Sequence, residues 1–525
     1  MSLTNPNAGR HYSYVEGAAL EIDCDYAIAG SGSGGSAAAI QLARAGFKVV
    51  VVEAGAWRNP QDYPHSMYGT MKEMFYDWGQ LIATGDSIIP VVQARTVGGT
   101  SVINSAIVVR TPGDVLQDWK MRLGLGDVFT EQSIGLAQDR IETELQVQVT
   151  PDAILGPSSA MMLDAMHKMG VDGHAITRNV AHCKGAMQCL QGCRNKSKQT
   201  ANFLWLRELI EEKQGSVLSC APVDQVLIEK GQAIGLQGRF QHPHTHKWGS
   251  SFVIRANRGV LLAASATGTA PLLWRSGVKL PYLGNGWRGH PGAGIVGVYD
   301  KPVDMHIGPS QAAASMHYRE NIGIKLESLS LPLELFAARV GGAGSELMQK
   351  LSEYRNCAMW VSAVRADAVG QLRRSVFGGT ALRYAPTPKD LERLRQGCKI
   401  VAQLHFAAGA KKIWPGIYGL PPEIGPNDLH LLDNAPLKNK SYTWVLSHLF
   451  GGAILGNDPN ESVVAPDLHV RGVRRLHVVC ASAIPTTLGV NPQHTIMALA
   501  MVTADRLIAD GAATTANAKQ VAIGG

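Results

Sequence analysis

The stretch Gly30-Ser31-Gly32-Ser33-Gly34-Gly35 decides how the N-terminal part of this chain folds. The apolar run from Asp25 to Ala29 precedes it and predicts a short buried strand. An alanine-rich segment follows it to about Arg44 and predicts a helix, and residues 48–52 predict a second strand that ends at Glu53. Strand, G-x-G-x-x-G, helix, strand and acidic residue in this order indicate a Rossmann-type dinucleotide-binding domain.

Each glycine of this motif has its own expected role. Gly30 permits the tight turn, Gly32 lets backbone amides approach the pyrophosphate, and Gly35 lets the helix pack on the strand. The N-terminus of the helix then faces the phosphates. Glu53 is placed to accept hydrogen bonds from ribose hydroxyls. The motif by itself does not separate FAD from NAD.

Length and composition set the class of protein. A chain of 525 residues predicts two domains, and 45% apolar with 17% charged residues is ordinary for a globular enzyme. The net charge of +7 is mild, and no run of Lys and Arg is interleaved with aromatic residues, so we expect no nucleic-acid partner. The first twelve residues carry no apolar signal region. We therefore expect a cytoplasmic protein without a membrane span.

Several motifs farther along the chain resemble those of a known family. The segment Arg95-Thr96-Val97-Gly98-Gly99-Thr100-Ser101-Val102-Ile103-Asn104 resembles the first signature of the glucose-methanol-choline (GMC) oxidoreductases. Residues 265–278 match the second signature loosely. Residues 447–452 and 489–497 resemble the catalytic histidine block and the final Asn-Pro helix. The resemblance covers about residues 23–510 and is closest to the cholesterol oxidase and long-chain alcohol oxidase branches.

The resemblance implies an α/β fold with two domains. The Rossmann-type FAD-binding domain is discontinuous and comprises residues 20–60, 92–295 and 440–512. Residues 61–91 form a lid, residues 296–440 form a substrate-binding domain built on an antiparallel sheet and helices, and residues 513–525 form a mobile tail.

The same resemblance implies FAD as the cofactor and assigns residues to it. Gly98, Gly99 and Asn104 line the flavin. The other positions assigned to the cofactor are Arg95, Val223, Ala481, Asn491 and Pro492. Ile103 stands where relatives with covalent FAD have a histidine, so we expect non-covalent FAD. Cys480 stands where the family usually has an aspartate, which puts one polar contact to the cofactor in doubt.

The resemblance assigns the chemistry to His448 and Asn491. We expect an alcohol to be oxidised to an aldehyde or ketone, with hydride transfer to flavin N5, His448 as the base and Asn491 as its hydrogen-bonding partner. His494, three residues after Asn491, could point toward the site or away from it. We expect His290 to be a structural residue or a neighbour of the cofactor.

Cys183, Cys189 and Cys193 are spaced as C-x5-C-x3-C and leave two interpretations open. They could ligate an iron–sulfur cluster, or they could be plain thiols in a loop. A cluster would favour an electron-transfer protein as acceptor, whereas plain thiols leave oxygen or a quinone.

The substrate expected from the branch resemblance is an apolar or bulky primary or secondary alcohol. Two alternatives share the fold: a hydroxynitrile lyase, which retains FAD without net redox chemistry, and a fatty-acid photodecarboxylase. A third alternative is a catalytically silent flavin-binding subunit.

Overall fold

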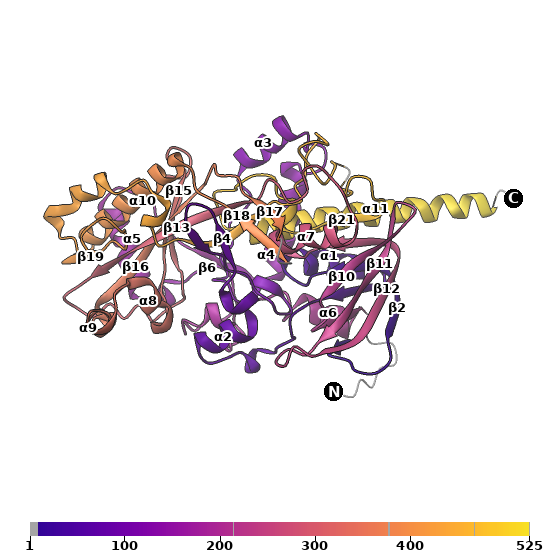
Figure 1. The fold of residues 1–525 in the computed structure, drawn as a ribbon, viewed down its shortest axis with the longest axis horizontal. Helices are drawn as coiled ribbons and strands as arrows, with labels where there is room; N and C mark the ends of the chain where they lie inside the picture. The colour runs from indigo at the N-terminus through magenta and orange to yellow at the C-terminus, as the bar shows by residue number, and fades with distance from the viewer. Residues whose placement is uncertain (1–8, 214, 376–378, 467, 524–525) are drawn as a thin grey trace.

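The computed structural model describes residues 9–213, 215–375, 379–466 and 468–523, with side chains described as far as residue 511. The chain forms two lobes (Figure 1). One lobe is built on the sheet that contains β2, β11 and β12, and the other on the sheet that contains β13, β15 and β16.

The first sheet has eight strands in the order β1-β9-β3-β2-β12-β11-β10, with β21 paired to β12. Its parallel part joins β1, β9, β3, β2, β12 and β21. The four valines of β3 are all buried, as expected for a central parallel strand covered on both faces. The strands span His11–Ser13 (β1), Leu20–Ala29 (β2), Val49–Val52 (β3), Ser216–Ser219 (β9), Val223–Glu229 (β10), Gln232–Gln241 (β11), Trp248–Leu262 (β12) and Leu476–Val478 (β21).

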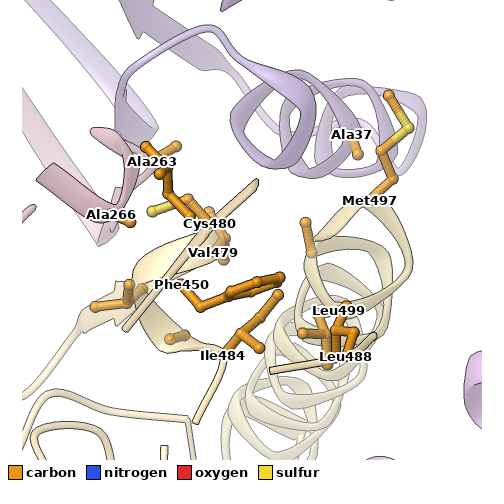
Figure 2. Close-up of a cluster of buried hydrophobic side chains, with 14 of the residues drawn as sticks. Ala37, Ala263, Ala266, Phe450, Val479, Cys480, Ile484, Leu488, Met497 and Leu499 are labelled. Carbon is orange, nitrogen blue, oxygen red and sulfur yellow. The ribbon is translucent and has the colours of Figure 1, made fainter. Parts of the chain in front are cut away.

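Helix α1 (Ser33–Arg44) follows the glycine motif, which confirms the strand–turn–helix prediction. It packs against α11 (Gln493–Ile523) and α6 (Trp205–Glu211). Figure 2 shows Ala37 of α1 beside Met497 of α11, and Val479 and Cys480 beside Ala263. Small side chains on α1 thus allow the C-terminal helix to approach the glycine motif.

The second sheet has seven strands in the order β19-β13-β16-β15-β14-β7, with β20 paired to β13. All of these pairs are antiparallel, and α10 (Pro388–Ala407) packs on β13, β15 and β16, so the predicted fold class is confirmed. The strands span His174–Ala175 (β7), Arg288–Val298 (β13), Ala313–Ser315 (β14), Ile324–Ser328 (β15), Cys357–Val364 (β16), Lys412–Trp414 (β19) and Val445–Phe450 (β20).

Strands of this sheet come from more than one of the segments expected for the two domains, and the domain boundaries stay a prediction. Strands β7 and β20 and most of β13 come from segments that we assigned to the cofactor-binding domain. The boundary expected at residue 295 therefore falls inside a continuous strand.

The segment expected to form a lid, 61–91, contains α2 (Met67–Met74), β4 (Ile82–Thr84) and β5 (Ile88–Pro90). Strands β4 and β5 join β17 (Gln371–Arg374) and β18 (Thr380–Arg383) in a four-stranded sheet. Tyr63 packs in one cluster with Val102 and Ile103 of the first signature. The segment thus lies against that signature, and its action as a lid stays a prediction.

The remaining helices cover the two lobes. They span Gly113–Leu123 (α3), Glu131–Glu144 (α4), Pro157–Lys168 (α5), Ser265–Arg275 (α7), Leu333–Val340 (α8) and Gly344–Ser352 (α9). A two-stranded sheet pairs β6 (Val147–Val149) with β8 (Thr177–Asn179). Among the described residues, no helix is both long and apolar enough to cross a membrane.

The C-terminal segment expected to be a mobile tail is helical as far as Ile523, where α11 ends (Figure 1). Residues 524–525 lie outside the described part of the chain. Whether this end of the helix moves in solution stays a prediction.

Candidate active site

Two glycine loops lie against each other at the N-terminus of α1. A Cβ atom on Gly99 would lie 2.6 Å from the Cα atom of Gly32, so the two backbones can approach this closely because Gly99 has no side chain. Gly30 has φ +106°, which fits its predicted turn. A Cβ on Gly35 would lie 2.0 Å from the carbonyl oxygen of Gly30, which supports its predicted role in helix packing.

The first turn of α1 is suited to an anion. Gly32 is the N-cap residue, no side chain caps the helix, and the first turn contains no acidic residue. Its amide groups and the positive end of the helix dipole are therefore available to a diphosphate. A Cβ on Gly32 would meet only the Cα of Gly99, at 3.9 Å, so the position is open on its other sides. This geometry fits the phosphates of a dinucleotide.

Glu53 holds the glycine motif in place. Its carboxylate accepts hydrogen bonds from the amide (3.0 Å) and hydroxyl (2.7 Å) of Ser31 and from the amide of Gly55 (2.8 Å). The hydroxyl of Ser31 in turn accepts from the amide of Gly98 at 3.0 Å. Glu53 thus connects the glycine motif to the first signature, and its contact with a ribose stays a prediction.

Asn104 is anchored from both sides. Its amide nitrogen donates to Gln493 Oε1, and its Oδ1 accepts from the amide of Ala106 at 2.9 Å. Beneath it, the ammonium of buried Lys198 donates to the carbonyls of Val102 (2.6 Å) and Asn104 (2.7 Å). Gln493 and Lys198 were not predicted, because neither forms a local pattern with the first signature.

The other positions assigned to the cofactor lie at the edges of the first sheet or near its ends. Arg95 donates to Gln241 Oε1 at 2.7 Å, and Val223 begins β10. The carbonyl of Ala481 accepts from the amide of Gly451 at 3.0 Å, and Pro492 immediately precedes α11. None of these contacts excludes a cofactor, and their role in binding stays a prediction.

Cys480 has two hydroxyl neighbours. Its sulfur lies 3.4 Å from Thr269 Oγ1 and 3.1 Å from Ser482 Oγ. The thiol is buried, and it lies beside Ala263 in a cluster of buried apolar side chains (Figure 2). The thiol that replaces the family aspartate is therefore hydrogen-bonded within the protein.

His448 and Asn491 come together although 43 positions separate them in the sequence. Strand β20 carries His448, Asn491 lies just before α11, and His448 Nε2 is 3.3 Å from Asn491 Nδ2. The other ring nitrogen, Nδ1, lies 3.2 Å from Nδ1 of His290. His290 Nε2 accepts from the amide of Gly489 at 2.9 Å.

Burial keeps both imidazoles neutral. It lowers the pKa of His448 to about 4, with Lys325 lowering it further and Glu327 opposing the shift. Burial and the neighbouring His448 ring lower the pKa of His290 well below its ordinary value. His448 still exposes part of its surface, so a ligand can reach the ring.

Two charged residues of β15 complete the cluster. The ammonium of Lys325 donates to Glu327 Oε1 at 2.7 Å and also to Asn491 Oδ1, and both charged residues are buried. Burial raises the pKa of Glu327, but the charge of Lys325 and its hydrogen bond outweigh this effect, so the pKa is lowered overall. The alternation Ile324-Lys325-Leu326-Glu327 could have signalled two charges on one strand face.

A cavity of about 360 Å³ opens beside Lys325. Its walls include the apolar residues Ile107, Val109, Ile176 and Ala314 and the charged residues Arg110 and Glu142. A small molecule can therefore reach Lys325 from this side.

Comparison with known proteins agrees with this architecture. Two models of the GMC oxidoreductase family match residues 71–292 and 376–500. The chain belongs to the GMC oxidoreductase family.

Relatives of this family cover nearly the whole chain. A GMC-type oxidoreductase of Mycobacterium tuberculosis is 32% identical over 92% of the chain, which covers 76% of that relative. A long-chain-alcohol oxidase of Arabidopsis thaliana is 26% identical over 95% of the chain and 70% of the relative. The crystal structure of pyridoxine 4-oxidase from Mesorbium loti has a TM-score of 0.71 at 17% identity, covering 92% of this chain and 99% of that chain. The family and fold predictions are confirmed.

Within this GMC fold, His494 points toward α4. Its Nε2 lies 2.9 Å from Glu142 Oε1, and this contact is the main reason why the pKa of Glu142 is lowered to about 2. His494 has no hydrogen bond to His448 or Asn491 among the contacts of the described residues. The geometry therefore favours the interpretation that His494 points away from the site.

Arg178 contacts two of the three cysteines. Among the described residues, no group of three or more His, Cys, Asp or Glu side chains is placed to hold a metal ion. Instead, Arg178 donates to Cys189 Sγ at 3.1 Å and to Cys183 Sγ at 3.7 Å. Burial raises the pKa of Cys189, but Arg178 and Lys198 outweigh burial and lower it overall. Arg178 thus contacts two of the thiols, and the choice between plain thiols and an iron–sulfur cluster stays a prediction.

Proposed function

We propose that this GMC oxidoreductase binds FAD without a covalent bond and oxidises an alcohol to an aldehyde or ketone. Membership of the family supports oxidation of a CH–OH donor in general. The relatives named as long-chain-alcohol oxidases and choline oxidase support an alcohol as the substrate.

The proposed FAD site combines the glycine motif and the first signature. The open position at Gly32 and the uncapped first turn of α1 support diphosphate binding there. Gly98, Gly99 and Asn104 would lie along the flavin, and apolar Ile103 offers no nucleophile for covalent attachment. When bound, FAD accepts the hydride that leaves the alcohol carbon.

The observation that carries the proposal is the 3.3 Å approach of His448 Nε2 to Nδ2 of buried Asn491. An alcohol oxygen placed against both nitrogens would be held by two polar groups. Since the pKa of His448 is lowered to about 4, the ring is neutral at physiological pH and can act in proton transfer.

The contacts of His290 restrict how His448 acts. Because the amide of Gly489 donates to His290 Nε2, neutral His290 carries its hydrogen on Nδ1 and donates it to His448 Nδ1. Neutral His448 then carries its own hydrogen on Nε2. In this form His448 donates to the alcohol oxygen and has no lone pair on Nε2 to accept the hydroxyl proton. For His448 Nε2 to act as the base expected from the sequence, both rings must adopt the other tautomer, with hydrogen on His448 Nδ1 and on His290 Nε2. That change breaks the hydrogen bond from the Gly489 amide.

The substrate that we propose is apolar or bulky, and the proposed electron acceptor is oxygen. Apolar side chains form much of the cavity wall beside Lys325, and several relatives are named as oxidases. We propose plain thiols for Cys183, Cys189 and Cys193, so no cluster is needed to carry electrons to a partner.

The decisive test is anaerobic mixing of the FAD-loaded protein with a panel of alcohols while the flavin band near 450 nm is followed. We expect at least one long-chain or bulky alcohol to bleach the band. A hydroxynitrile lyase, a photodecarboxylase in the dark or a silent subunit would leave it unchanged.

The matched variants are His448→Ala and His430→Ala, which changes an exposed histidine. His448→Ala should slow flavin reduction by about 100-fold or more while FAD stays bound, and His430→Ala should have no effect. A His448→Ala variant that reduces its flavin at the original rate would remove His448 from the chemistry.

A further inference from the structure

A buried ion pair lies directly behind Asn491. Lys325 and Glu327 are each 4% exposed and belong to β15 of the second sheet, whereas Asn491 belongs to the C-terminal segment. The ammonium of Lys325 lies 2.7 Å from Glu327 Oε1 and also donates to Asn491 Oδ1. Burying two charges is costly unless each is paired, so this pair is unusual in a site whose proposed chemistry uses other residues.

The ammonium determines which way the Asn491 amide points. An ammonium has only hydrogen-bond donors, so the atom of Asn491 that faces Lys325 must be the oxygen. The amide nitrogen then faces His448 Nε2, at 3.3 Å. Without a fixed donor behind it, the amide could turn over, because a rotation of 180° exchanges its nitrogen and oxygen with little change of shape.

The positions of the hydrogens on His290 and His448 are also fixed by a neighbour. The Gly489 amide directs the hydrogens of His290 and His448 so that neutral His448 carries a hydrogen on Nε2. Both groups on the substrate side of the cluster are then donors and face a common point. Two donors cannot satisfy each other, but both can donate to one oxygen atom placed between them.

We infer that Lys325, held by Glu327, is a positioning residue that keeps the Asn491 amide turned with its nitrogen toward the substrate oxygen. This inference rests on the proposed alcohol oxidation and deepens it. Lys325 acts through Asn491 and need not touch the substrate. The Asn491 nitrogen held in this orientation can donate to the substrate oxygen as that oxygen gains negative charge.

The test is a double-mutant cycle on the rate of flavin reduction at saturating alcohol in the FAD-loaded full chain. Lys325→Met removes the ammonium and should lower the rate by about 100-fold, the usual effect of losing one such donor. Asn491→Ala should lower it by a similar factor. If Lys325 acts through Asn491, the double variant should be no slower than Asn491→Ala alone. Effects that multiply in the double variant would overturn the inference.

Two further variants separate positioning from folding. Lys325→Met leaves Glu327 as an unpaired buried charge, so Lys325→Met/Glu327→Gln, which buries no charge, should fold better and remain as slow.

Lys325→Ala should be rescued by propylammonium, because Lys325 borders the cavity of about 360 Å³ through which a small amine can enter. Rescue should be absent in Asn491→Ala. Lys438→Met, at an exposed lysine, is the control and should reduce normally with or without the amine.

The outcomes distinguish this inference from the proposed function. If His448→Ala is slow but Lys325→Met reduces its flavin at the original rate, the role of Lys325 is wrong and the proposed function stands. If no alcohol reduces the flavin of the unmodified protein, the proposed function is wrong and the inference falls with it.

Discussion

At the scale of single residues, the protonation state of His448 sets the conditions under which the site can work. Burial lowers the pKa of this ring to about 4, so lowering the pH from 8 to 5 leaves it neutral. An unshifted histidine would titrate near 6.5 over the same range.

The rate of flavin reduction at saturating alcohol should therefore be level between about pH 5 and pH 8, without a step near 6.5. Below this range, a fall centred near pH 4 would indicate that His448 acts as a base, because its lone pair is then lost. A level rate would indicate the donor form. Stopped-flow reduction across this range is the measurement. A step centred between pH 6 and 7 would show that the pKa is not lowered as the burial of the ring requires.

At the scale of elements, the glycine motif joins α1 to the rest of the site through backbone contacts. A Cβ on Gly34 would lie 1.8 Å from the carbonyl oxygen of Val479, which follows β21. A Cβ on Gly32 would meet no atom closer than 3.9 Å, and the backbone there has an ordinary negative φ of −67°. The two glycines therefore have different reasons to lack a side chain.

The matched substitutions Gly34→Ala and Gly32→Ala should separate folding from cofactor binding. Gly34→Ala pushes α1 away from the strand end and should destabilise the protein by about 3 kcal/mol, seen as a lower midpoint of thermal unfolding. Gly32→Ala should keep the midpoint of the flavin-free protein but weaken FAD binding by at least tenfold, measured by flavin fluorescence. Equal losses of stability in both variants would contradict this division.

The sequence predicted the elements whose signals are local. The glycine motif, α1, β3 and Glu53 lie within one short segment, so their order alone indicated the Rossmann-type unit. Lys325 and Gln493 were missed because long-range packing brings them to the site: the first lies on a strand between β14 and β16, the second at the start of the last helix. His448 and Asn491 were found only through the resemblance, since neither has a neighbouring pattern that marks it.

At the scale of the whole molecule, the lobe built on the second sheet carries three histidines whose pKa values are lowered. His290 in β13, His448 in β20 and His405 in α10 all belong to the lobe built on the second sheet. Burial lowers all three pKa values, that of His405 to about 3. His405 is fully buried, is stacked on Trp360 at 3.9 Å and lies far from the proposed chemistry in sequence and contacts.

This lobe should therefore lose stability in mild acid. In the unfolded chain a histidine binds a proton as the pH falls through about 6.5, whereas in the folded chain His405 and His448 resist binding until about 3 and about 4. Unfolding is consequently favoured as the pH falls below 6.5, by about 2 kcal/mol for each such histidine at pH 5.

His405→Gln keeps a polar group and removes the titration of one buried histidine. Urea unfolding at pH 7.5 and pH 5 should show a smaller acid loss in His405→Gln than in the unmodified chain, and exposed His430→Gln should change nothing. An acid loss unaffected by His405→Gln would mean that other groups, such as the buried carboxylate of Glu327, control acid unfolding.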